Sequence, residues 1–116
     1  METFLLLLHG NATARPDLSP AEMQAMFAKY RAWTETLKKA GHYVGGNKLE
    51  DGTARIMRAN GGKAHVTDGP FAETKDVIAG YYMIQCANYE EAVAISQECP
   101  HLNFGTVEIR RVEVMA

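Results

Sequence analysis

The stretch TDGPFAETKD, residues 67–76, lies near the middle of the chain, and the elements expected on either side of it define the fold. Pro70 has its φ fixed at about −65° and suits the second position of a turn, while Gly69 permits backbone shapes that other residues avoid. Asp68 therefore lies where a strand ends and a conformationally restricted turn begins, and we call residues 67–76 the corner. We take this corner as the organising feature of the chain and as the first place to look for a functional site.

A strand and a long helix are expected first. Residues 3–9 are a short run dominated by leucine, and an apolar run of this length indicates a central strand buried on both faces. Ser19-Pro20-Ala21-Glu22 combines a capping box with proline at the first helical position, and methionines and aromatic residues follow at helical spacing. Gly41 supplies a left-handed stop. The pattern predicts a helix over residues 20–40 with one apolar face.

A second strand and a hairpin are expected before the corner. Residues 42–49 can form a strand, in which Gly45-Gly46 weakens the pairing or marks a bulge. Asn60-Gly61-Gly62 is a strong hairpin signal between alternating runs at residues 53–58 and 63–67. The sequence thus predicts a hairpin inserted between the second strand and the corner.

The elements after the corner complete the fold. Residues 77–87 are rich in β-branched and aromatic side chains and predict a strand. Asn88-Tyr89-Glu90-Glu91 repeats the capping pattern and starts a second helix, which Pro100 ends. Residues 106–114 alternate as a strand, and Arg110-Arg111 interrupts the alternation, which favours a bulge or an edge. Without the hairpin the order is β-α-β-β-α-β, a ferredoxin-like α+β fold with an antiparallel sheet and two helices on one face.

The chain of 116 residues suits a single domain spanning residues 1–116. The sheet face opposite the helices needs cover, and a small chain with a half-bare sheet commonly finds it in a second copy. We therefore expect a homodimer.

Composition excludes several classes of function. With a net charge of −2 the chain has no excess of basic residues, so neither nucleic acid nor a membrane surface is expected as a partner. No nucleotide-binding, flavin-binding or metal-ligand spacing is present, so no cofactor and no metal are expected. Cys86 and Cys99 are interpreted as buried free thiols in a reducing compartment. The N-terminal apolar run lacks the cationic start and the length of a signal peptide, which favours a cytoplasmic protein.

The corner and its neighbours carry the candidate catalytic residues. Asp68 can act as a general acid/base, or it can simply accept backbone amides as an Asx-turn. Glu73 and Lys75 can form a solvated surface turn, or one of them can enter a cleft beside Asp68 or a substrate. In a ferredoxin-like sheet the first and third core strands are antiparallel neighbours, so the end of the first strand, His9, comes near residues 77–81. His9 is then either a surface strand end or the partner of an acid in a pocket.

The candidate substrate-binding residues are apolar or cationic. Trp33 belongs to the Met and aromatic stripe of the first helix, which is expected to face the core, with a ligand-facing Trp33 as the alternative. Together with Phe71 and Tyr81 it would line an apolar pocket beside the few polar groups, and Lys75 would contact the substrate.

The corner also carries a family resemblance. Asp68 to Lys75, followed by Ala79-Gly80-Tyr81-Tyr82, resembles the signature of the DGPF branch of the YCII-related family. The resemblance spans nearly the whole chain, and its supporting features are Trp33, Gly41, Gly45-Gly46-Asn47-Lys48-Leu49, Pro100 and Gly105-Thr106-Val107-Glu108-Ile109-Arg110.

The resemblance implies a dimeric α+β barrel in which two ferredoxin-like sheets pack face to face. It implies an active site built from a His/Asp pair in a cleft. Asp68 occupies the aspartate position of the motif, whereas no histidine here matches a family histidine. Members of this branch are often encoded near extracytoplasmic-function sigma factors, which suggests a regulatory or stress-linked context.

Three hypotheses follow. The first is a cofactor-free lyase, isomerase or hydrolase that uses Asp68 with His9 or Glu73. The second is a non-catalytic dimer that binds a small metabolite or a regulatory partner. The third is that the corner is architectural and holds the hairpin against the sheet or the partner.

Overall fold

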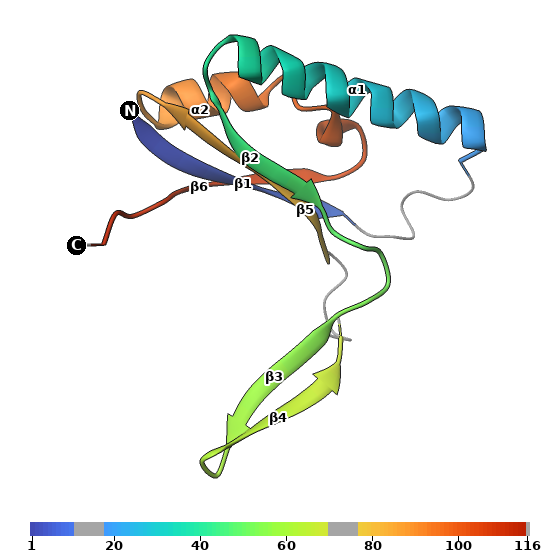
Figure 1. Cartoon of the computed structure of the whole chain (residues 1–116), viewed down its shortest axis with the longest axis vertical. Helices are drawn as coiled ribbons and strands as arrows, with labels where there is room; N and C mark the ends of the chain where they lie inside the picture. Colours follow the sequence, from blue (N-terminus) through green and yellow to red (C-terminus); the bar gives the residue numbers. More distant parts are fainter. Residues whose placement is uncertain (11–17, 70–76, 116) are drawn as a thin grey trace.

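The computed structural model describes residues 1–10, 18–69 and 77–115, and its central feature is a four-stranded antiparallel sheet with the strand order β2-β5-β1-β6. Both α-helices cover the same face of this sheet (Figure 1). The protein is thus an α+β protein whose architecture is consistent with the predicted ferredoxin-like fold. The elements are β1 (Glu2–Gly10), α1 (Pro20–Lys39), β2 (Tyr43–Lys48), β3 (Arg55–Asn60), β4 (Lys63–Asp68), β5 (Val77–Cys86), α2 (Tyr89–Ser96), the short 3-10 helix η2 (Pro100–Asn103) and β6 (Thr106–Arg111).

Helix α1 begins and ends where its sequence signals predict. The Ser19 hydroxyl accepts a hydrogen bond from the Glu22 amide at 3.1 Å, and the Glu22 carboxylate accepts one from the Ser19 amide at 3.2 Å. Gly41 has a φ of 78°, a conformation that disfavours side chains with a Cβ. The capping box and the glycine stop therefore confirm the expected bounds of this helix to within one residue.

The alternation of side chains along β1 places the core on the helix side of the sheet. Phe4, Leu6 and Leu8 are buried, and they pack with residues of β5 and α1 in one apolar cluster. Leu5 and Leu7 alternate with them and are only partly buried. The expectation that β1 is buried on both faces is therefore wrong for a single chain, because no element of the described residues covers the second face.

Strand pairing confirms the predicted topology and also decides the alternatives that the sequence left open for the second and last strands. His9 pairs with Ile78 and Gly10 with Val77, so the end of β1 lies beside the start of β5 as expected. The register of β2 shifts between Tyr43 and Gly45, which is the bulge alternative for the glycine pair. β6 is an edge strand, which is the edge alternative for its arginine pair.

The chain around Pro100 differs from the prediction. Helix α2 ends at Ser96, and Pro100 begins η2 instead of ending α2. The reason is that Pro lacks an amide hydrogen, which costs nothing at the first position of a new helix. This short helix carries His101, which is fully buried.

The hairpin of β3 and β4 projects away from the four-stranded sheet, on the side opposite the helices (Figure 1). Met57 pairs with Val66 across it, and these side chains are 66% and 57% exposed. An isolated two-stranded hairpin is at best marginally stable in water, so this arm needs a further contact.

Both cysteines are free thiols in the core, as expected from the sequence. Burial raises the pKa of the Cys99 thiol to about 11, so the thiol stays protonated at neutral pH. No helix in the described part of the chain combines the length and apolar character needed to cross a membrane.

Candidate functional site

A cavity of about 610 Å³ lies between α1 and the sheet, and we call it the helix–sheet cavity. Its lining comes from α1, from the β2 and β5 strands, from Leu8 of β1 and from His101 of η2. Cavities of this size are typical of small-molecule sites, which combine apolar walls with a few polar groups.

Aromatic side chains form much of the wall. The ring of Tyr82 meets Tyr43 edge to face, with centroids 6.5 Å apart, and both residues line the cavity. Trp33 also packs against Tyr82, with centroids 4.8 Å apart and planes at 79°. Edge-to-face pairs of this kind hold rings in place beyond what burial alone provides. The wall of the cavity is therefore rigid at Tyr82.

Hydroxyl groups inside the cavity have fixed donor roles. The Thr34 hydroxyl donates to the Tyr30 carbonyl at 2.8 Å, one turn back on α1. A hydroxyl has a single hydrogen, so in the 3.1 Å contact between Thr34 and Tyr82 the Tyr82 hydroxyl is the donor. Burial raises the pKa of the Tyr82 phenol, which favours this protonated form. The Tyr82 oxygen therefore presents acceptor lone pairs to the cavity.

His101 connects the cavity to β1. Its Nε2 lies 2.7 Å from the His9 carbonyl oxygen, which can only accept, so Nε2 carries a hydrogen and donates it. In the neutral imidazole Nδ1 then accepts from the Tyr30 hydroxyl at 3.1 Å. Because His101 is fully buried, these two hydrogen bonds set both its tautomer and the position of Tyr30.

Exposed charged side chains surround the mouth. Among the described residues that line the cavity, Arg31, Lys38 and Lys48 are cationic and Glu35 is acidic. Lys38 lies 3.6 Å from Glu35, and its ammonium also stands 5.3 Å from the centre of the Tyr43 ring. The mouth is therefore net positive, although the whole chain has a net charge of −2.

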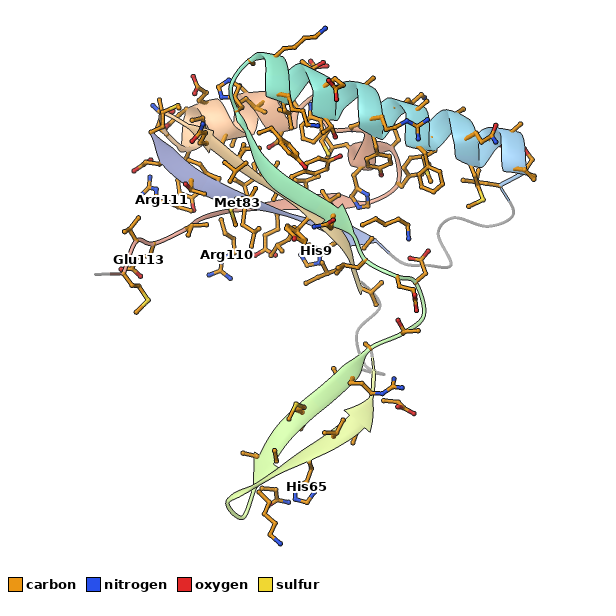
Figure 2. The ribbon with its side chains drawn as sticks, viewed as in Figure 1. His9, His65, Met83, Arg110, Arg111 and Glu113 are labelled. Atoms are coloured by element: carbon orange, nitrogen blue, oxygen red, sulfur yellow. The ribbon has the colours of Figure 1, made fainter. Side chains whose placement is uncertain are left out.

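A second polar group lies on the sheet face away from the helices. His9 Nε2 is 2.8 Å from a Glu108 carboxylate oxygen, and both side chains are partly buried. Met83 and Arg110 project from the same face (Figure 2). The backbone carbonyl of His9 thus contacts His101, which lines the cavity, whereas the imidazole of His9 lies on this open face and contacts Glu108.

The sequence profile of the YCII-related domain matches residues 3–116. The chain belongs to the YCII-related family. In the part of this YCII-related protein that the structure describes, no group of three His, Cys, Asp or Glu residues is placed to hold a metal ion.

Two further proteins are similar to this YCII-related chain. An uncharacterised protein of Rhizobium meliloti (strain 1021) is 39% identical over 59 residues, a match that covers 49% of this chain and 48% of that protein. The chain thus spans about half the length of this relative. The solved structure of 5-chloro-2-hydroxyhydroquinone dehydrochlorinase (TftG) from Burkholderia phenoliruptrix AC1100, in complex with 2,5-dihydroxybenzoquinone, has a TM-score of 0.48 and 17% identity and covers 96% of this chain and 93% of its own. A likeness of this degree says nothing about the activity of this chain.

The structure describes four of the predicted site residues of this YCII-related protein, namely Asp68, His9, Trp33 and Tyr81, and places them in different parts of the fold. Asp68 ends β4 with its side chain 90% exposed, and its carboxylate lies 3.4 Å from Arg55 across the hairpin. His9 pairs with Glu108 instead of an aspartate. Asp68 and His9 are absent from the lining of the helix–sheet cavity. Three of the other predicted residues, Phe71, Glu73 and Lys75, lie outside the described residues.

The two remaining predicted residues lie near the cavity in different ways. Trp33 is 6% exposed, belongs to the core cluster and is absent from the lining of the cavity, which agrees with the expectation that it faces the core. Tyr81 is among the lining residues, and its hydroxyl accepts a hydrogen bond from the Asn47 amide at 3.0 Å.

Sequence reasoning missed Tyr30, Thr34, Tyr82 and His101. Tyr30 was visible as a member of the apolar stripe on α1, and Tyr82 as part of a strand, but both patterns equally fit the core. His101 is separated from Tyr30 by 71 positions and from His9 by 92. No local signal links residues at such separations, and the signal that could have found His101 is its place directly after Pro100 at the start of a helix.

Proposed function

We propose that this protein binds a small, mainly aromatic molecule in the helix–sheet cavity and does so as a homodimer. The observation that supports binding most strongly is a cavity of about 610 Å³ whose buried or partly buried polar residues, Tyr30, Thr34, Tyr82 and His101, are joined by hydrogen bonds. Preorganised polar groups in an apolar cavity lower the entropic cost of binding a ligand.

Binding in the cavity is tested with N-phenyl-1-naphthylamine, a neutral probe whose fluorescence rises in an apolar site. Thr34→Phe places a ring inside the cavity and is expected to weaken binding about tenfold or more, which is 1.4 kcal/mol or more. The matched control is Thr36→Phe, because Thr36 donates to a carbonyl four residues back in the same way, at 3.1 Å, but does not line the cavity. Equal affinity of the two variants, or no binding by the wild type, would contradict the proposal.

Catalysis by Asp68, with His9 or Glu73 as its partner, is the alternative proposal. It is favoured by the open position of the Asp68 carboxylate, which among the described residues contacts the Arg55 guanidinium and no backbone amide. In the same titration Asp68→Ala keeps the probe affinity if the cavity alone binds the ligand. A loss of affinity in Asp68→Ala would favour a site that includes the corner.

The homodimer proposal is supported by the open face of the sheet. Leu5 and Leu7 lie there, and in the β1–β6 register they stand opposite Arg110 and Glu108. A two-fold interface brings one patch against its own copy, so an apolar patch that carries both signs of charge is self-complementary. The projecting hairpin, with its exposed Met57 and Val66, would gain the contact it needs from the partner.

Leu7→Asp is expected to convert the dimer to a monomer, because it places a charge in an apolar patch and beside Glu108. The dimer dissociation constant should rise by about a hundredfold or more, as for a central interface residue. Sedimentation velocity at micromolar concentration measures it. The control is Leu102→Asp, an exposed leucine on η2 that lies outside the sheet. The dimer proposal would be contradicted if the wild-type protein were monomeric at this concentration.

Membership of the DGPF branch, a cytoplasmic location and a regulatory context linked to sigma factors belong to this proposal as well. Their support is the motif that begins at Asp68-Gly69-Pro70-Phe71 and the resemblance that it carries. A metabolite-binding dimer is compatible with that context, since binding of a ligand to one chain can change the stability of an interface on the opposite sheet face.

A further inference from the structure

We infer that the ligand of the helix–sheet cavity is a flat organic acid that carries a hydroxyl or amino donor at the end opposite its carboxylate. The inference rests on the proposed binding function and assigns a chemical class to its ligand. Three independent features of the cavity lead to it: the charges at the mouth, the hydrogens of the inner hydroxyl groups and the aromatic wall.

The mouth of the cavity favours an anion. Arg31, Lys38 and Lys48 line it, and within residues 1–10, 18–69 and 77–115 Arg31 has no ion-pair partner. The pairs that Lys38 and Lys48 make, at 3.6 Å with Glu35 and 3.3 Å with Asp51, involve side chains that are about half exposed. Exposed pairs of this kind contribute little stability, so both ammonium groups can turn to a carboxylate at small cost.

The inner end of the cavity favours a hydrogen-bond donor. The hydrogen of the Thr34 hydroxyl is used by the Tyr30 carbonyl, and the hydrogen of the Tyr82 hydroxyl is used by Thr34. The Tyr82 oxygen is therefore an acceptor for any further partner. A ligand carbonyl placed there could not form a hydrogen bond, because both oxygens would be acceptors. A ligand hydroxyl or amine could donate to the Tyr82 oxygen and complete the chain of hydrogen bonds.

The wall between these two ends favours a flat ring. Phe27, Tyr30, Tyr43 and Tyr82 all line the cavity, and Trp33 contacts the Tyr82 ring edge to face. Aromatic side chains recognise flat rings by stacking and by edge-to-face contact. A rigid ring system would also keep the acid and the donor apart, so that the acid can contact the exposed cations while the donor contacts the Tyr82 oxygen.

The experiment compares three probes by isothermal titration calorimetry or by their own fluorescence: 6-hydroxy-2-naphthoate, 2-naphthoate, which lacks the donor, and 2-naphthol, which lacks the acid. The first should bind about tenfold more tightly than either analogue at low salt, as expected for one hydrogen bond or one charge contact. Added salt should weaken the two acids and leave 2-naphthol unchanged.

Two variants assign these differences to residues. Tyr82→Phe keeps the ring and removes the acceptor, so 6-hydroxy-2-naphthoate should bind no better than 2-naphthoate. Arg31→Gln should weaken both acids about fivefold, the size of an exposed charge contact, without changing 2-naphthol. The matched control is Lys29→Gln, an exposed cation on the same helix that is absent from the cavity lining.

The inference is overturned if 2-naphthol or 2-naphthoate binds as tightly as 6-hydroxy-2-naphthoate, or if Lys29→Gln and Arg31→Gln weaken the acids equally. It is also overturned if the neutral N-phenyl-1-naphthylamine binds in the cavity and none of the acids does. That result leaves the binding function standing. If neither the neutral probes nor the acids bind, the proposed function fails together with the inference.

Discussion

Gly105→Ala is expected to lower the free energy of unfolding by more than about 3 kcal/mol, or to prevent folding, which is the largest effect that we predict for a single methyl group. A Cβ at Gly105 would collide with the backbone carbonyl oxygen of His9 and would stand 2.9 Å from Nε2 of His101. These two atoms are hydrogen-bonded to each other at 2.7 Å, so neither can move without breaking that bond. The Gly105 amide is held as well, because it donates to the His101 carbonyl at 2.9 Å.

The matched control is Gly45→Ala. A Cβ at Gly45 would meet no atom within 4 Å, and its backbone needs no positive φ. We expect the stability to change by less than about 0.5 kcal/mol, as for most surface substitutions. Urea denaturation followed by circular dichroism compares the two variants at one protein concentration. Equal stability of Gly105→Ala and Gly45→Ala would show that β1 and η2 do not pack as described.

His101→Ala is expected to have the second largest effect, a loss of about 3–5 kcal/mol in the free energy of unfolding. The imidazole is fully buried, so its removal leaves a void. It also removes the partner of the His9 carbonyl and the partner of the Tyr30 hydroxyl. Loss of this support should reduce binding of the neutral probe in the cavity, because Tyr30 loses one of the contacts that position it.

His65→Ala is the control for this substitution. His65 is an exposed histidine on β4, paired with Arg58 across the hairpin and absent from the cavity lining, and Figure 2 shows it toward the tip of the projecting hairpin. We expect its removal to change stability by less than about 0.5 kcal/mol and to leave probe binding intact. If the two histidine variants have the same melting temperature, His101 does not hold η2 to β1.

Local signals in the sequence were sufficient for the α-helices and the strands, whereas the short helix η2 was not predicted. The Ser19 and Glu22 capping box and the Gly41 stop set the ends of α1, because these signals act on backbone groups within a few residues. The hairpin follows in the same way from Asn60-Gly61-Gly62, where both glycines have positive φ, at 62° and 82°. The antiparallel pairing of β1 with β5 follows from the order of the elements and is confirmed.

The candidate site depended on long-range contacts that no local signal encodes. The sequence pointed to Asp68 and His9. The structure places Asp68 on the hairpin, in an ion pair with Arg55, and His9 on the open sheet face, hydrogen-bonded to Glu108. The partner of His9 is 99 positions away and is selected by the register of β6 against β1. Side-chain type alone cannot predict such a register.

The sequence by itself determined the family, the order of helices and strands and the apolar residues of the core, because capping, turn formation and alternation are decided between near neighbours. Only the tertiary structure decided which aromatic residues face a cavity and which fill the core. Trp33 and Tyr30 belong to one stripe of α1, yet Trp33 is buried in the core cluster against Tyr82, while Tyr30 lines the cavity and contacts His101. Helix α1, β5 and η2 reach these positions only when the sheet assembles, and their packing converts a set of apolar and polar side chains into a cavity with a cationic mouth and fixed hydrogen-bond acceptors.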